Sequence, residues 1–157
     1  MILQSLRVEN FCKFRQPFEL SELDSGLNLI TGPNEAGKST LVRAIRTVFL
    51  ERYSTSTLAG LQPYGNTAVA PSVAVTFSHE NQAWSLTKSF NKTQRCDLSV
   101  GGQQLSNSDA ENKLAELLRY SYAKKGSSKP EHQGIPGLLW VEQGSGQELS
   151  SAAQHAG

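Results

Sequence analysis

This sequence of 157 residues has little of what marks several specialised protein classes. Its two cysteines, Cys12 and Cys96, form no C-x-x-C pair and no ligand cluster with the three histidines. We therefore expect free thiols in a reducing compartment rather than a disulfide scaffold. No signal peptide opens the chain, and its apolar runs are too short to span a bilayer. A cytoplasmic protein without a membrane partner is expected.

An excess of one charge is also missing, since the formal net charge is +1. No global basic field attracts nucleic acid, although a local patch needs no net charge. The chain shows no internal repeat. Its length suits one domain and is sufficient to bury a real core.

What the sequence does contain is a phosphate-binding loop. Residues 32–40 read Gly-Pro-Asn-Glu-Ala-Gly-Lys-Ser-Thr and match G-x-x-x-x-G-K-[ST]. Residues 27–31, just before the loop, are short and apolar enough for a buried strand. Apolar residues then recur at helical spacing from Leu41 to Phe49. A strand, loop and helix over residues 27–50 is the context that phosphate binding requires. The alternative is a glycine-rich turn before an ordinary helix.

Each residue type in this loop suits a phosphate. Backbone N–H groups of the loop and of the helix N-terminus would surround the anion, where the helix dipole favours negative charge. Gly32 and Gly37 permit close approach and unusual backbone angles. Lys38 would reach the β- and γ-phosphates as the catalytic cation, and the Ser39 hydroxyl would hold Mg²⁺. The predicted binding residues are Gly32, Pro33, Asn34, Glu35, Ala36, Gly37, Lys38, Ser39 and Thr40.

Alternating patterns predict strands on both sides of this unit. Residues 2–11 read as a half-buried strand with Ile2, Leu6 and Val8 on one face, and residues 14–20 as a second strand in which Pro17 marks an edge or a bulge. Residues 72–105 predict an antiparallel meander with short polar connections and a turn at Gly101-Gly102.

Charged residues lie on or beside this meander, and a helix is expected after it. Lys88, Lys92 and Arg95 would either face DNA or belong to a solvated strand face. Ser108 followed by Glu111 fits a capping box at the start of the helix.

Two later stretches imitate parts of a complete cassette ATPase. Residues 98–104 look like an L-S-G-G-Q signature with Val100 inserted, but the extra residue spoils the spacing and alternation makes Gly101-Gly102 a hairpin turn. Residues 138–141 are a short apolar run that suits a central strand and ends in Glu142 without an Asp-Glu pair. Gln143 is the better candidate there, because its carbonyl can coordinate Mg²⁺ and orient a water. A surface glutamine in a turn is the alternative.

These segments together resemble a known family. Residues 6–11 with Lys13, residues 27–40 and residues 138–144 follow the order at the start of the ATPase head of structural-maintenance-of-chromosomes (SMC) proteins. Within that family the sequence resembles the SbcC-type double-strand-break-repair relatives and bacterial SMC-like defence ATPases such as those of Lamassu systems. The resemblance covers residues 1 to about 144. Relatives often carry Arg directly after Asn-Phe, whereas Cys12 and Lys13 stand here. Lys13 is therefore either a phosphate contact or a surface charge.

The resemblance implies a P-loop ATPase of the ABC/SMC-head type, with an α/β fold. A mixed sheet would hold the strands at 27–31 and 138–144 beside the loop helix, with an antiparallel lobe at about 72–105. The implied cofactors are ATP and Mg²⁺, with Lys38, Ser39 and Thr40 on phosphates and Mg²⁺ and with Gln143 as the glutamine-loop residue.

The resemblance also implies what residues 1–157 lack. The signature, the Asp-Glu pair, the switch histidine and a long coiled coil of such heads are not in this sequence. We therefore expect the first half of a split head, inactive alone, which needs the C-terminal half. The complete head would form a homodimer around ATP and bind DNA, which would associate it with the nucleoid. It would act in repair or antiviral defence with a partner nuclease.

Three other classes share parts of the pattern. A nuclease-fused ATPase of the overcoming-lysogenisation type has the same kind of head. A cassette transporter subunit would use an aromatic residue such as Phe11 or Phe14 to stack on adenine. A small-molecule kinase would be complete at this length and active alone.

Overall fold

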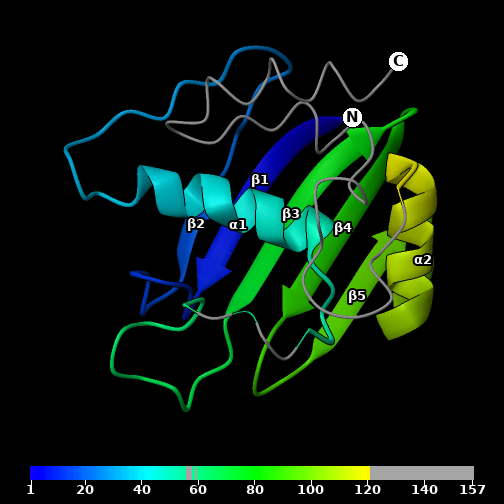
Figure 1. The fold of residues 1–157 in the computed structure, drawn as a ribbon. Helices are drawn as coiled ribbons and strands as arrows, with labels where there is room; N and C mark the ends of the chain where they lie inside the picture. Colours follow the sequence, from blue (N-terminus) through cyan, green and yellow to red (C-terminus); the bar gives the residue numbers. More distant parts are fainter. Residues whose placement is uncertain (56–57, 59, 121–157) are drawn as a thin grey trace, which may run out of the picture.

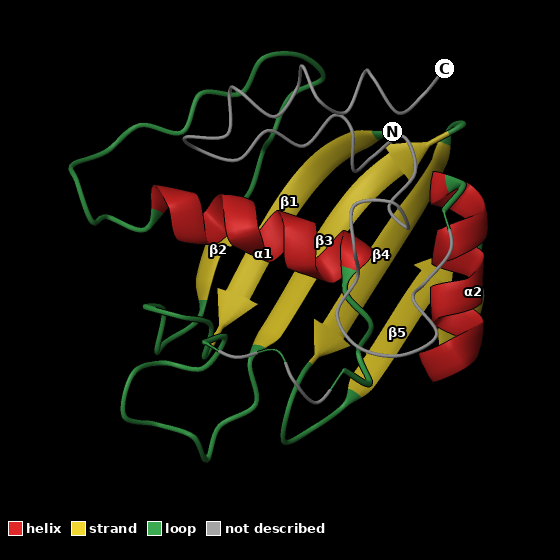
Figure 2. Cartoon of the chain, viewed as in Figure 1, coloured by secondary structure: helices red, strands yellow, loops and turns green. Residues whose placement is uncertain are grey.

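The computed structural model describes residues 1–55, 58 and 60–120. In this part of the chain one six-stranded antiparallel sheet, in the order β2-β1-β3-β4-β5-β6, carries two helices (Figure 2). The elements are β1 Ile2–Glu9, β2 Phe18–Leu20, α1 Lys38–Leu50, β3 Ser72–His79, β4 Gln82–Ser89, β5 Arg95–Val100, β6 Gln103–Ser106 and α2 Asn107–Leu118. The predicted strand at 138–144, with Glu142 and Gln143, lies outside the described residues.

One face of the sheet is buried under both helices. Helix α1 crosses in front of β1, β3 and β4, and α2 runs beside β5 (Figure 1). Alternate residues of the meander enter the core, as predicted: the strand pairs place Val75 opposite Leu86, and Leu86 opposite Leu98. An antiparallel sheet of this kind keeps one face on the core and leaves the other polar.

Two-residue turns with left-handed backbone connect the meander. Glu80 and Asn81 join β3 to β4 with φ of 49° and 60°, and Gly101 and Gly102 join β5 to β6 with φ of 54° and 82°. Positive φ at both positions is the type I′ geometry that matches strand twist. The rejection of an L-S-G-G-Q signature is confirmed, because these glycines close a hairpin.

The first strand departs from the predicted alternation. The pairing with β3 passes from Leu3–Phe77 directly to Ser5–Thr76, which leaves one extra residue in β1. Such a bulge reverses the faces of the residues before it. Ile2 is therefore 41% exposed, and Leu3 packs against the core in its place. The prediction that Ile2 shares the inner face with Leu6 was wrong.

Strand β2 is shorter than predicted, and the strand before the loop is missing. β2 begins after Pro17 and occupies a sheet edge, where proline is tolerated. Residues 27–31 form no strand, and Leu27 and Leu29 are 96% and 81% exposed. A buried strand needs hydrogen-bonding neighbours on both sides, and the described part of the chain places none beside this segment.

The capping box predicted from Ser108 and Glu111 is also wrong. Helix α2 begins at Asn107, its N-cap is Ser106, and no side chain caps it. The Glu111 side chain is instead 1% exposed. Its carboxylate accepts a 2.7 Å hydrogen bond from the backbone N–H of Tyr53 and lies 3.3 Å from Lys88 Nζ. The spacing of Ser108 and Glu111 fits a capping box, but the buried Glu111 carboxylate pairs with Tyr53 and Lys88 instead of with the helix N-terminus.

Lys88 matches neither sequence interpretation. It is 0% exposed on the inner sheet face, and its Nζ donates a 2.7 Å hydrogen bond to the carbonyl of Glu51. Burial lowers the pKa of Lys88, and the nearby Glu111 carboxylate opposes that shift. Lys92 is exposed, and Arg95 forms an exposed ion pair with Asp97, so these two fit a solvated face.

Replacing Lys88 alone should be severe. Lys88→Met leaves the Glu111 carboxylate buried without its cation, so we expect a loss of about 3–5 kcal/mol in the free energy of unfolding. Lys92→Met is the control, and as an exposed change it should stay within about 0.5 kcal/mol. Urea denaturation of both variants tests this, and equal midpoints would show that Lys88 is not buried in an ion pair.

Candidate functional site

The predicted loop forms the entry to helix α1. Gly37 is the N-cap residue with φ of 108°, and Lys38 is the first helical residue. The Leu41 N–H donates to the Gly37 carbonyl at 3.0 Å, and the Ala36 N–H donates to the Pro33 carbonyl at 3.2 Å. The loop thus turns directly into the helix, and a helix N-terminus carries a partial positive charge.

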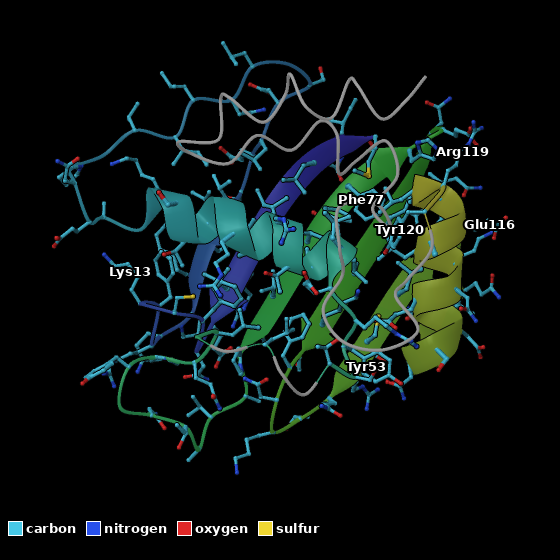
Figure 3. The ribbon with its side chains drawn as sticks, viewed as in Figure 1. Lys13, Tyr53, Phe77, Glu116, Arg119 and Tyr120 are labelled. Atoms are coloured by element: carbon cyan, nitrogen blue, oxygen red, sulfur yellow. The ribbon has the colours of Figure 1, made fainter. Side chains whose placement is uncertain are left out.

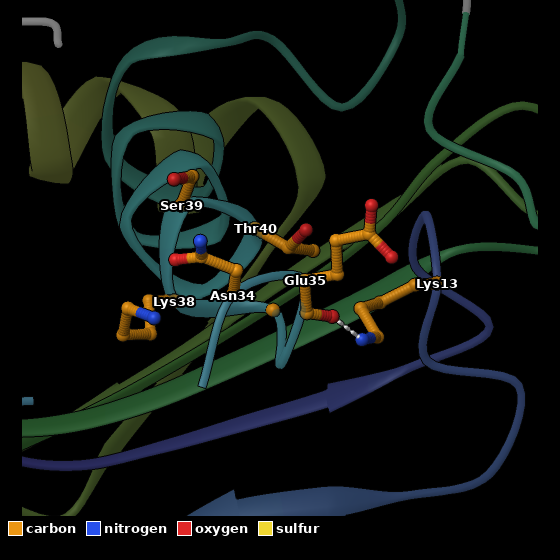
Figure 4. Close-up of a pocket in the computed structure, with 7 residues that line it drawn as sticks. Lys13, Asn34, Glu35, Lys38, Ser39 and Thr40 are labelled. Atoms are coloured by element: carbon orange, nitrogen blue, oxygen red, sulfur yellow. Dashed lines mark hydrogen bonds between the residues drawn. The ribbon is translucent and has the colours of Figure 1, made fainter. Parts of the chain in front are cut away.

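A pocket of about 610 Å³ opens at this helix end (Figure 4). Two cations from different parts of the chain, Lys13 and Lys38, line it together with the hydroxyls of Ser39 and Thr40. Its lining residues are Lys13, Asn34, Glu35, Gly37, Lys38, Ser39 and Thr40. Ammonium groups beside a helix N-terminus make an anion-binding site.

Lys38 lies across the loop to which it belongs. Its Nζ donates hydrogen bonds of 2.7 Å to the carbonyls of both Gly32 and Pro33. An ammonium group has three donors, so these two contacts leave room for a third acceptor. Both contacts are exposed, which lets an anion in the pocket compete for the same donors.

Lys13 reaches the same loop from the turn that follows β1. Phe11 and Phe14 exchange two backbone hydrogen bonds of 2.9 Å, which places Lys13 at the tip of a tight turn. Its Nζ donates to the Glu35 carbonyl (Figure 4). The structure therefore brings Lys13 to the pocket, and its contact with phosphate stays a prediction.

Phe14 supports the loop in a way that sequence reasoning missed. A Cβ on Gly37 would lie 2.8 Å from the Phe14 ring and 2.9 Å from the Lys13 side chain. The Phe14 ring in turn stacks on Phe18, with centroids 4.9 Å apart. Phe14 is thus partly buried, and Phe11 is fully buried. A buried Phe11 cannot stack on a base, which removes one basis for the transporter alternative.

Cys12 fastens the same turn to α1. Its Sγ donates to the Gly60 carbonyl at 3.2 Å, and its backbone N–H donates to the Leu61 carbonyl at 2.6 Å. Arg43 of α1 donates to both Cys12 Sγ and the Gly60 carbonyl. Burial raises the pKa of the Cys12 thiol, although Arg43 lowers it. A protonated thiol that donates to a carbonyl is structural, as expected for a free cysteine.

Residues 1–55, 58 and 60–120 supply no further metal centre. No group of three His, Cys, Asp or Glu side chains in that part could hold a metal ion. Ser39 is the metal ligand proposed from its sequence position, and Gln143 lies beyond the described residues. No helix there is long and apolar enough to cross a membrane.

Comparisons with known proteins agree with this geometry. A family model described as an AAA domain matches residues 5–133. A solved structure described as "Structural biochemistry of ATP-driven dimerization and DNA stimulated activation of SMC ATPases" is 14% identical, has a TM-score of 0.56, and covers 100% of this chain and 93% of that chain. An SMC head domain from Thermotoga maritima is 20% identical with a TM-score of 0.44, over 82% of this chain and 44% of that chain. No curated protein matches. The family match and the first structure confirm the expected α/β P-loop ATPase fold of the SMC-head type.

The contact between Gly37 and Phe14 makes a testable prediction. Gly37→Ala adds a methyl group at positive φ against an aromatic ring, so we expect a loss of about 1–3 kcal/mol in the free energy of unfolding. Gly26→Ala is the matched control, because a Cβ there has nothing within 4 Å. Thermal unfolding of the two variants compares them. Similar midpoints would contradict the packing of Phe14 on the loop.

Proposed function

The chain belongs to the AAA domain family, and from that premise we propose that residues 1–157 form the ATP- and Mg²⁺-binding half of an SMC-like ATPase head. The observation that carries this proposal is the pocket at the N-terminus of α1, which Lys13 and Lys38 both line. It combines two positive side chains, a helix N-terminus and two hydroxyls, which together suit a nucleoside triphosphate with its metal.

The loop residues divide this task among them. The backbone from Gly32 to Thr40 cradles the β- and γ-phosphates, and Lys38 exchanges a loop carbonyl for a phosphate oxygen. The Ser39 hydroxyl would hold the Mg²⁺. Lys13 supplies a second positive charge from the turn after β1. Mg²⁺ held at Ser39 would neutralise part of the phosphate charge.

The complete head requires a second half that closes over the phosphates. We propose that the exposed segment at 27–31 receives neighbours from this C-terminal half, since Leu27 and Leu29 are too exposed for an isolated chain. The Gln143 side chain would coordinate the metal and orient the attacking water. Two such heads would dimerise on ATP, as the description of the first solved structure says of its own protein. The full protein would then bind DNA, in repair or phage defence, with a nuclease partner.

Lys38→Ala tests the nucleotide assignment. We expect most ATP affinity to disappear while the fold remains, because the Lys38 side chain donates its hydrogen bonds to exposed loop carbonyls rather than to the core. Isothermal titration calorimetry measures binding, and circular dichroism checks the fold. Lys92→Ala, an exposed lysine outside the pocket, should bind as the wild type does. ATP binding by Lys38→Ala that is as strong as in the wild type would contradict the assignment of this loop as the nucleotide site.

Gln143 and Glu142 are compared in the whole protein. Gln143→Ala should impair Mg²⁺-dependent turnover and largely preserve nucleotide binding, because the residue is proposed to orient water rather than hold phosphate. Glu142→Gln should have a much smaller effect. Steady-state phosphate release distinguishes them. A Glu142→Gln variant that alone stops hydrolysis and traps ATP would instead favour a compact cassette ATPase.

The isolated chain should have no turnover above background. Stabilising a phosphoryl-transfer transition state needs groups on both sides of the γ-phosphate, and residues 1–157 contain no signature loop and no Asp-Glu pair to supply the second side. Adding the C-terminal half should restore Mg²⁺-dependent hydrolysis. Phosphate release from the chain alone and from the reconstituted pair is measured. Robust turnover by the chain alone, lost in Lys38→Ala, would contradict the split head.

A further inference from the structure

Helix α1 is held at both ends by side chains from other elements. Its loop end meets Lys13, and its far end runs into residues 51–53, which lie against β4 and α2. Figure 3 shows these two ends, with Lys13 on one side of the ribbon and Tyr53 near β5 and α2 on the other. Thirteen helical residues separate them by about 20 Å.

The far end is fixed by two buried charges. Lys88 Nζ donates to the Glu51 carbonyl at 2.7 Å, just where α1 ends. The Glu111 carboxylate accepts from the Tyr53 N–H at 2.7 Å and from Arg52 Nε at 3.4 Å. The two side chains also pair with each other at 3.3 Å and are 0% and 1% exposed. The Lys88 cation thus pairs a carbonyl that the helix C-terminus leaves unpaired, and the Glu111 carboxylate pairs the Tyr53 N–H in the turn that follows.

Stability alone does not account for this pair. Removing two charges from water is costly, and well-packed apolar residues of similar volume are often equally or more stabilising. An apolar pair, however, would bond to neither the Glu51 carbonyl nor the Tyr53 N–H. What the charged pair adds is a defined position for the end of α1 relative to β4 and α2.

We propose that Lys88 and Glu111 are positioning residues for the nucleotide loop. By fixing the C-terminal end of α1 against β4 and α2, they set the orientation of the whole helix and therefore of the loop at its other end. The link works in both directions, because a coupling between two sites is reciprocal. Nucleotide bound in the loop stabilises the hydrogen bond of Tyr53 to Glu111, and movement of β4 and α2 alters the position of the loop. The nucleotide part of this inference rests on the proposed function.

The test replaces the pair by apolar residues of similar size. The double variant Lys88→Met with Glu111→Leu leaves no unpaired buried charge, so the fold should be retained, with a urea midpoint lowered only by the lost bonds to the Glu51 carbonyl and the Tyr53 N–H. The matched control is Lys113→Met with Glu116→Leu, which removes an exposed pair of 2.9 Å on α2. Both are made in the full chain.

The first readout needs no nucleotide. Hydrogen exchange of the Leu41 amide reports the loop end of α1, because that amide donates to the Gly37 carbonyl. We expect it to exchange about fivefold faster or more in the double variant, in line with ordinary coupling between sites. The control should exchange as the wild type does. A pair that is only structural would affect amides near residues 51–53 and leave Leu41 unchanged, and that result would overturn the proposal.

The second readout is Mg-ATP affinity, which should fall by about fivefold or more in the double variant alone. If the wild type binds no ATP, the proposed function fails, and the exchange of Leu41 still decides this inference. If the double variant does not fold, Glu111→Asp replaces it, because it keeps the charge and shortens the arm. Faster Leu41 exchange in Glu111→Asp supports the proposal, and a wild-type rate in it contradicts the proposal.

Discussion

The burial of helix α1 against the apolar face of the sheet is the constraint on which the site depends. Leu41, Ala44 and Val48 pack inward along the helix, and the helix contacts β1, β3 and β4. Because a helix is stiff over this length, its position on the sheet decides where its N-terminus opens. The turn at Lys13 and the buried pair at Lys88 then fix its two ends.

Most of the pocket follows from this placement. Gly37 can adopt a φ of 108° and accept the Phe14 ring only because it has no side chain. Lys38 then begins the helix with its ammonium over the loop carbonyls. The Phe11–Phe14 backbone hydrogen bonds close the turn after β1, and the hydrogen bonds of Cys12 hold it, so Lys13 reaches the pocket. The turn after β1 and the entry to α1 thus converge on one pocket.

The sequence predicted local features well and partners poorly. The loop motif, the helix after it and the meander were visible because each depends on neighbouring residues. Lys88 was interpreted as a surface charge and Glu111 as part of a capping box, because the sequence does not show that these opposite charges, 23 positions apart, are buried beside each other. The bulge that exposes Ile2 has no signal in an alternating pattern. The strand at 27–31 was expected from its apolar residues, but a strand also needs neighbours to pair with.

The central claim is that the entry to α1 binds a nucleotide phosphate. Titrating the ¹⁵N-labelled chain with Mg-ATP and following its amide resonances tests this most directly. We predict saturable shifts concentrated at Gly37, Lys38 and Ser39, with Gly101 and Gly102 unchanged because they form a hairpin on a different part of the sheet. Saturable shifts centred elsewhere, or none at Gly37 to Ser39 at millimolar Mg-ATP, would contradict the claim.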